Sequence, residues 1–253
     1  MKRLWWLFAA GLFLLALIVQ WPAAWLAPRI EQATQQRWRL GSVRGTVWRG
    51  QAVLYSLDRS SGRWHPGRRI HWDFVWGELL RGRLAVQTGL GDAGRVRLAA
   101  GPRSWSIEEL DATMPAEQIA VLLPATLADY GWSGPMHARA QVFSCQWGRA
   151  GCVGRIDLSW TKAAVAYVPG PPLGDYQLRL TAEGKALRFD LATVRGRLRI
   201  TGAGELSGGA LRFTGEAWAN GEHAGNLETI LQALGRPGAA PGRYLIEYRE
   251  KIR

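Results

Sequence analysis

The residues best suited to chemistry are two cysteines, Cys145 and Cys152, with six residues between them. Gly148 and Gly151 lie in that interval and allow the chain to turn back tightly. In an exported domain, two cysteines so close in sequence predict one structural disulfide, worth about 2–3 kcal/mol for so short a loop. The alternative is a redox or zinc site, but the C-x-x-C spacing is absent. The four histidines are scattered: His65, His71, His137 and His223.

Other catalytic patterns are missing. The sequence contains neither Ser-x-x-Lys nor Gly-x-Ser-x-Gly. The segment from Gly202 to Ser207 approaches a phosphate-binding loop, but it lacks the third glycine and lies in an alternating strand pattern. The neighbours Glu108 and Glu109 point in different directions on any regular element, which favours a solvated loop over a catalytic pair. We therefore expect no enzyme activity, no cofactor and no metal site.

The composition is that of a folded, basic protein. The chain has 253 residues, 47% of them apolar and 21% charged, with a formal net charge of +12. Only four of its 32 basic residues are lysines. The arginine excess has two explanations, recognition of phosphate groups or a GC-rich genome. The arginines are scattered and form no basic run, so we expect no nucleic-acid partner. Anionic lipid headgroups would attract such a domain at a membrane.

The N-terminal segment is apolar. Residues 4–27 contain one polar side chain, Gln20, and no charge, which predicts a transmembrane helix. Tryptophan pairs stand near its two ends, at positions 5 and 6 and at positions 21 and 25. Residues 1–3 would form a cytoplasmic tip and residues 28–40 a polar stalk. The flank after the helix is also basic, so charge alone does not fix the orientation. A cleaved signal peptide is the alternative, with a poor cleavage site at Pro22-Ala23-Ala24.

The remaining residues, 41–253, predict a mainly β fold. Apolar residues alternate with polar ones in many runs, for example Ile70, Trp72 and Phe74, which is typical of antiparallel strands with one buried face. Glycines separate the runs at turn spacing. Two short helices are expected, over residues 115–123 and over residues 227–234 with Asn226 as N-cap. The fold class is therefore an elongated antiparallel sheet with short helices.

A faint internal repeat suggests two similar β-units, over about residues 41–130 and 131–253. Arg69-Ile70-His71-Trp72-Asp73-Phe74 resembles Arg155-Ile156-Asp157-Leu158-Ser159-Trp160, and Trp72 and Trp160 are expected as the repeat-equivalent strand aromatics. Stacked units would form one long twisted sheet. Its apolar face would stay exposed unless a helix or a partner covered it.

After the apolar segment comes Gly45-Thr46-Val47-Trp48-Arg49-Gly50. This stretch resembles the element just past the membrane helix in the type II secretion system protein N family. The resemblance continues through Ile70-His71-Trp72, the turn Leu79-Leu80-Arg81-Gly82-Arg83-Leu84, the paired cysteines, and Pro172-Leu173-Gly174-Asp175-Tyr176 with Gly202 and Gly204. It covers nearly the whole chain.

The resemblance implies a non-enzymatic accessory component of the machine that moves folded periplasmic proteins through an outer-membrane secretin. It implies an inner-membrane protein with a cytoplasmic N-terminus, a periplasmic C-terminal domain, and the inner-membrane platform or the secretin as partner. In the hexapeptide, Gly45 and Gly50 permit a positive φ or close backbone approach, and Thr46 and Trp48 are expected on one face of a strand. The motif is either structural or a docking edge for a neighbouring subunit.

A second hypothesis comes from another class of protein. Anchored periplasmic sheets that resemble the AsmA and TamB group carry acyl chains in an apolar groove, and this chain shares the anchor and the amphipathic strands. A groove predicts apolar side chains with no helix over them, which would allow lipid contact. An assembly protein predicts a closed core, contacting its partners by edge-strand addition or through an apolar face.

Overall fold

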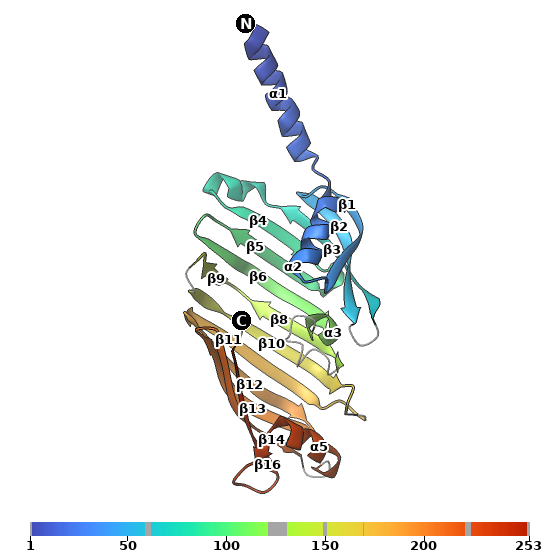
Figure 1. The fold of residues 1–253 in the computed structure, drawn as a ribbon, viewed down its shortest axis with the longest axis vertical. Helices are drawn as coiled ribbons and strands as arrows, with labels where there is room; N and C mark the ends of the chain where they lie inside the picture. Colours follow the sequence, from blue (N-terminus) through green and yellow to red (C-terminus); the bar gives the residue numbers. More distant parts are fainter. Residues whose placement is uncertain are drawn as a thin grey trace.

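The structure, a computed structural model, describes residues 2–58, 62–120, 131–148, 151–168, 170–220 and 224–251. Within this part of the chain, sixteen strands form one antiparallel sheet. The strands are stacked along the long axis of the molecule, and α1 (Lys2–Val19) projects from one end (Figure 1). A mainly β fold built on a long antiparallel sheet is therefore confirmed.

The order of strands along the sheet follows the order in the chain, so nearly every connection is a hairpin. The first six strands are β1 (Trp38–Gly45), β2 (Arg49–Asp58), β3 (Arg63–Phe74), β4 (Leu84–Gly89), β5 (Gly94–Ala100) and β6 (Ser104–Pro115). The short strands β8 (Pro135–Ala140) and β9 (Phe143–Gln146) lie end to end between β6 and β10 (Cys152–Val165), and β7 (Trp132–Ser133) also pairs with β10. The remaining strands are β11 (Gly174–Gly184), β12 (Ala186–Gly196), β13 (Leu198–Ser207), β14 (Ala210–Ala219), β15 (Arg236–Pro237) and β16 (Arg243–Lys251). The sheet continues from β6 to β10 across the expected junction of the two repeat units.

One face of the sheet is apolar along its whole length. The register places Met114, Met136, Trp160 and Tyr176 in a row across four neighbouring strands. Because side chains alternate between faces, the next residues along these strands fall on the other side. The period-two pattern of the sequence thus becomes two faces of opposite character.

The opposite face is polar and carries charges of alternating sign. Residues in register across six strands form a row, and two neighbouring pairs are in contact: Arg139 with Asp111 at 3.3 Å and Arg179 with Asp157 at 3.0 Å. The row consists of Arg95, Asp111, Arg139, Asp157, Arg179 and Asp190. Unlike charges opposite one another favour this register over a slipped one.

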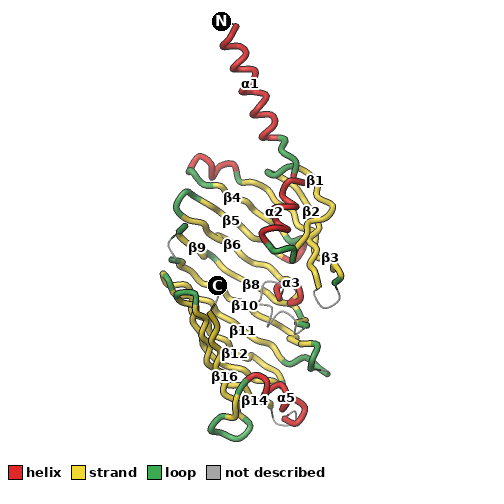
Figure 2. Tube along the Cα trace, viewed as in Figure 1, coloured by secondary structure: helices red, strands yellow, loops and turns green. Residues whose placement is uncertain are grey.

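Helices cover the apolar face at its two ends (Figure 2). Near α1, η1 (Ala23–Trp25) and α2 (Leu26–Ala33) pack on a core that contains Leu40, Leu54 and Trp72. At the far end, α5 (Ala224–Leu234) packs on Tyr176, Leu198 and Ile246. Shorter helical segments are η2 (Trp76–Arg81), η3 (Gly91–Ala93) and α3 (Ala116–Ala120).

The N-terminal prediction needs correction. In the described part of the chain, no helix is both long enough and apolar enough to cross a membrane. The helix expected over residues 4–27 ends at Val19, and Pro22 is extended, with φ −64° and ψ 135°. Ala23 is fully buried against the sheet, so the apolar residues after Pro22 belong to the folded domain. The residues expected as a stalk complete α2 and begin β1.

The two helices expected in the body are present with different bounds. The first, α3, is described only to Ala120, and residues 121–123 of the prediction lie outside the described part. The second ends at Leu234, as predicted, but begins at Ala224. Asn226 is therefore inside the helix and is not its N-cap.

Candidate functional site

The family-like hexapeptide forms the turn between β1 and β2. Gly45 and Gly50 lie opposite each other, and Gly45 has a φ of +92°. A side chain at Gly45 would meet the Arg49 carbonyl oxygen at 2.4 Å, so only glycine fits. The Thr46 amide donates to the Arg49 carbonyl at 2.9 Å, and the Arg49 amide donates to the Thr46 hydroxyl at 3.2 Å. Thr46 and Trp48 are thus turn residues, and their expected place on one strand face was wrong.

This turn holds the chain where it leaves α1. The Val47 amide donates to the Trp21 carbonyl at 2.9 Å, and Pro22 forms a β-bridge with Thr46. The indole N–H of Trp48 donates to the carbonyl of Ile18 at 2.7 Å. Backbone groups at the end of α1, which have no partner inside the helix, are thereby bonded to the sheet.

Aromatic rings surround the turn. Trp72 is 7% exposed, donates its indole N–H to the Thr46 carbonyl at 3.3 Å, and lies against Gly50, where a side chain would come within 2.5 Å of its ring. On the outer side, the ring of Trp48 lies 5.1 Å from those of both Phe74 and Trp76. The turn, β3 and η2 therefore form one packed aromatic unit.

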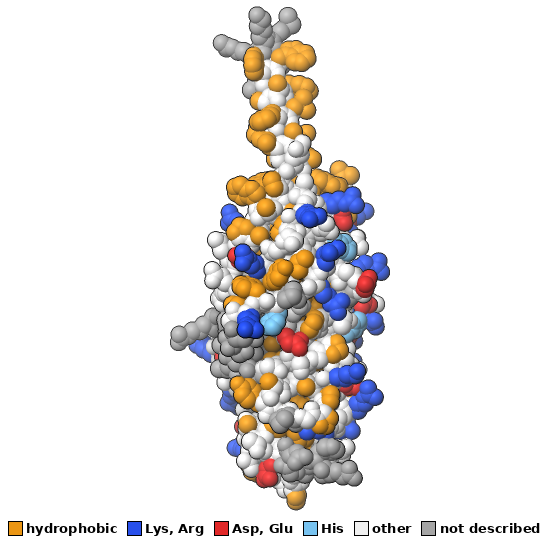
Figure 3. All heavy atoms as spheres, turned by 90° about the vertical axis from the view of Figure 1, so that its right-hand side faces the viewer, with side chains coloured by type: hydrophobic (Ala, Val, Ile, Leu, Met, Phe, Trp, Pro, Cys, Tyr) orange, Lys and Arg blue, Asp and Glu red, His pale blue; other side chains and the backbone are white. Residues whose placement is uncertain are grey.

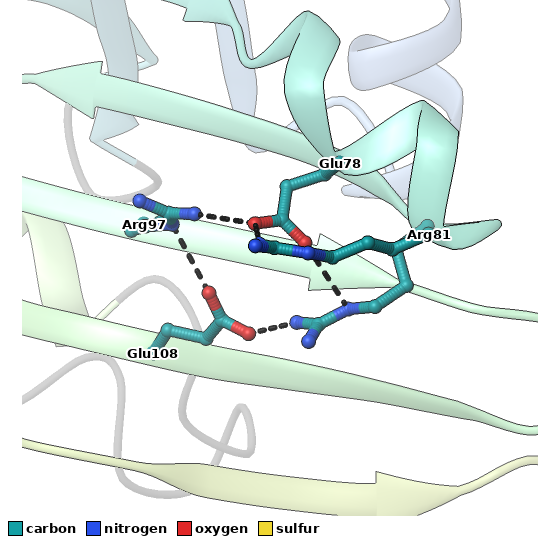
Figure 4. A network of polar contacts seen from close by, with 5 residues as sticks. Glu78, Arg81, Arg97 and Glu108 are labelled. Carbon is teal, nitrogen blue, oxygen red and sulfur yellow. Dashed lines mark hydrogen bonds and ion pairs between the residues drawn. The ribbon is translucent and has the colours of Figure 1, made fainter.

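A network of charged side chains fixes η2 on the polar side of the sheet (Figure 4). Glu78 is only 6% exposed, and its carboxylate contacts Arg81 at 3.0 Å, Arg97 at 3.1 Å and Arg83 at 3.8 Å. Glu108 also pairs with Arg83, and it contacts Arg97 at 3.0 Å. A buried carboxylate is stable only with such partners. Glu78 therefore ties η2 to β5 and β6.

The sequence interpretation missed this network. Glu78 and Arg81 belong to η2, and Arg83 lies between η2 and β4. Arg97 belongs to β5 and Glu108 to β6. Glu108 and Glu109 lie in strand β6, so the solvated loop expected there was wrong. The register shift between Arg97 and Leu98 leaves Glu108 without an opposite residue and turns it toward the arginines. A bulge of this kind has no local sequence signal.

A comparison against protein families covers the turn and most of the sheet. The family described as "Type II secretion system (T2SS), protein N" matches residues 36–247, from just before β1 into β16. The chain belongs to the type II secretion system protein N family. Among curated proteins and solved structures, none matches the chain. The matched residues include the turn, the charge network and both cysteines, whereas α1 lies before them.

The predicted disulfide of this family member is confirmed. Cys145 and Cys152 are opposite each other in β9 and β10, with a Cα–Cα distance of 4.0 Å. Cys145 is buried beside Phe143 and Ala182. The bridge therefore closes the sheet where β9 interrupts the regular hairpin order.

Trp160 has a role in the far half that parallels Trp72. It is half-buried, donates its indole N–H to the Ser133 carbonyl at 3.0 Å, and lies 5.0 Å from Trp132 and 5.8 Å from Tyr176. Each of the two tryptophans thus bonds a carbonyl in a neighbouring connection. The structure brings Gly45, Thr46, Trp48, Gly50 and Trp72 together, and it places Trp160 and the disulfide in other regions.

Two titratable groups near Trp160 are perturbed. Asp175 accepts from the Lys162 amide at 2.7 Å, where the φ of Lys162 is +49°, and pairs with Arg195 at 2.5 Å. These hydrogen bonds hold the pKa of Asp175 below its usual value. Burial raises the pKa of Tyr176, whose hydroxyl donates to the Leu198 carbonyl at 2.9 Å. Asp175 therefore secures the β10–β11 bulge, and Tyr176 ties β11 to the start of β13.

The glycine-rich segment and the histidines have structural surroundings. Gly204 lies in β13 between Phe189 and Phe213, whose rings stack 5.8 Å apart across it. His137 faces Thr113 at 2.9 Å. His223 lies outside the described residues. Among the residues that are described, no three histidine, cysteine, aspartate or glutamate side chains gather as metal ligands.

Proposed function

We propose that the chain is a non-enzymatic component of the type II secretion system, attached to the inner membrane through α1. Its sheet lies in the periplasm. The observation that carries the proposal is family membership over residues 36–247, which implies a type II secretion component that works with other components of that system.

The exposed surface of α1 supports attachment to the membrane. Its described side chains beyond the first turn are mostly large and apolar, and they face outward: Leu12 is 52% exposed, Phe13 65% and Ile18 47%. Such a helix is unfavourable in water and favourable in lipid. The disulfide supports a periplasmic sheet, because structural disulfides persist in oxidising compartments.

The outer surfaces of the sheet support an assembly role. β1 is an edge strand with β2 as its hydrogen-bonded neighbour, and it carries a bulge at Ser42, where φ is +51°. Bulges and charged side chains discourage indiscriminate pairing at an edge. At the opposite edge, β15 pairs with only two residues of β16. A secretion partner would add to this second edge or contact the polar face.

One feature of the middle of the apolar face favours lipid handling as a second candidate function. α2 and α5 cover the ends of the apolar face, but Ile156, Leu158, Leu178 and Leu180 between them are only half-buried. Among the described residues, the core is closed at both ends, and the only buried cluster in the middle is the small one formed by Phe143, Cys145 and Ala182. An acyl chain would fit an apolar strip of this kind.

Gentle solubilisation of the native membrane, followed by mass spectrometry of proteins and lipids that co-purify, tests both functions. Secretin or inner-membrane platform subunits without stoichiometric lipid would support the proposal. Stoichiometric phospholipid or lipopolysaccharide without a secretion partner would overturn it in favour of lipid handling. A parallel preparation carrying Leu178→Glu and Leu180→Glu serves as the matched control, since these changes should release lipid held on the apolar strip.

A further inference from the structure

The end of the sheet nearest α1 carries exposed apolar side chains that no core residue covers. They belong to η1, to η2 and to the short link between α1 and η1. Trp25 is 61% exposed, Trp76 52% and Leu80 93%. We call the set of Trp21, Trp25, Trp76, Leu79 and Leu80 the apolar collar. Figure 3 shows apolar side chains along α1 and again on the end of the body from which α1 leaves.

The collar is tied to the base of α1. Trp76 packs on Trp48, and the Trp48 indole is bonded to the Ile18 carbonyl. On the other side, the rings of Trp21 and Trp25 lie 6.0 Å apart in an edge-to-face arrangement. The collar therefore flanks the exit of α1 and cannot move far from it.

The side chains of η2 are arranged in the opposite way to those of a segment exposed to water. Its carboxylate, Glu78, is turned inward to three arginines, while Leu79 and Leu80 face outward. A surface turn normally exposes its charge and buries its leucines. Gly82, with a φ of +69°, ends the segment and fixes this orientation. The inversion makes sense if the environment outside Leu80 is itself apolar.

The far end of the molecule provides an internal comparison. The described residues of β13, β14, α5, β15 and β16 contribute no member to the exposed large apolar side chains. Exposure of this kind therefore distinguishes the end from which α1 emerges from the described residues of the far end, although single exposed side chains such as Trp147 and Tyr167 also occur along the sheet.

We propose that the apolar collar lies in the headgroup region of the membrane and seats the sheet directly on the bilayer. Tryptophan is enriched at this depth because its ring is apolar and its N–H is polar. Arg81, whose side chain is 73% exposed, and Arg49, 85% exposed, lie next to the collar and suit anionic headgroups. This inference rests on the proposed attachment through α1, and it adds a second contact that holds the sheet at a fixed height.

The test uses the full chain in vesicles of equimolar phosphatidylcholine and phosphatidylglycerol. Three variants, Leu12→Cys, Leu80→Cys and Ala240→Cys, each gain one free cysteine that carries a nitrobenzoxadiazole probe, and the native cysteines stay in their disulfide. Lipids with a doxyl group near the headgroup quench probes at that depth, and lipids with the doxyl group deep in the acyl chain test the position-12 probe. We expect the position-80 probe to be quenched at least about twofold more than the position-240 probe, which lies in the exposed far loop.

The outcomes separate the collar from the anchor. Quenching at position 12 with a position-80 probe that behaves like the one at position 240 would overturn the collar and leave attachment intact. The absence of quenching at position 12 would overturn attachment itself. A position-80 probe shielded from both the lipid quencher and aqueous iodide would show that protein covers the collar, which also contradicts the proposal.

Discussion

The two ends of the sheet use apolar residues differently. At the far end, α5 inserts Leu227 and Leu231, which are 0% and 3% exposed, into the core. Near α1, helix α2 has no buried residue, and tryptophans and leucines of the collar stay outside. The far end therefore uses its apolar surface for stability, whereas the end near α1 keeps apolar surface available for contact.

Two sites in the two halves also use charged residues differently. Near α1, Glu78 is buried among arginines and fixes a surface segment. In the far half, pairs such as Arg188 with Glu183, at 3.1 Å, are exposed on both sides. Exposed pairs contribute little to stability, so their main role is to specify register.

Leu227→Ala is expected to have the largest effect on stability. The change should lower the free energy of unfolding by about 3 kcal/mol, because it opens a cavity under α5. Ile30→Ala on the half-buried side of α2 is the matched control and should cost about 1 kcal/mol. Urea unfolding of the full chain in detergent measures both. Equal losses would contradict the contrast between the two ends.

Cys145→Ser should come next, at about 2 kcal/mol, because the bridge closes a short loop in the middle of the sheet. Association with membranes should remain unchanged. The urea midpoint of the variant, compared with that of the wild type, measures the loss, and the Cys145→Ser/Cys152→Ser double variant controls for the free thiol left at Cys152. A free thiol in freshly isolated wild-type protein would refute the disulfide.

Glu78→Gln should cost about 1–2 kcal/mol, since it leaves three guanidinium groups without their shared carboxylate, and these groups are partly exposed. Glu183→Gln, which removes an exposed pair in the far half, should change stability by less than about 0.5 kcal/mol. Thermal unfolding at low and high salt compares the two. If Glu183→Gln lowers stability as much as Glu78→Gln does, the conclusion that exposed ion pairs contribute little to stability is contradicted.

Asp175 should give the smallest effect, visible only in acid. Its pKa is lower in the folded than in the unfolded chain, so its contribution is present above the unfolded value of about 3.9 and is lost as the pH falls through the folded value. In the Asp175→Asn variant, the free energy of unfolding should fall less steeply as the pH is lowered in the acid range, with a difference of about 1 kcal/mol or less. An unchanged acid limb would show that the bulge at Lys162 does not depend on this carboxylate.

Local patterns predicted the strands well. Ile70, Trp72 and Phe74 share the apolar face, as do Leu187, Phe189 and Leu191, because alternation is a property of a single strand. The disulfide also followed from local spacing. The spacing of Thr46 and Trp48 predicts a strand, whereas the φ of Gly45 and the hydrogen bonds between Thr46 and Arg49 make the hexapeptide a turn.

Features that depend on distant residues were not predictable. An apolar count cannot distinguish Ala23, which is buried in the core with Leu40, from a residue in lipid, so it predicts a first helix that is longer than α1. The Glu78 network needs the register of β4, β5 and β6 and a bulge between Arg97 and Leu98. The row of charged residues from Arg95 to Asp190 gives some of the arginines a structural role that composition does not reveal.

The most direct test of the central claim is secretion itself. In cells that lack this chain, proteomics of the periplasm and the culture medium measures where type II substrates accumulate. The account predicts that substrates remain in the periplasm and return to the medium when the wild-type chain is restored. An unchanged distribution, in cells whose system is active, would contradict a role in type II secretion.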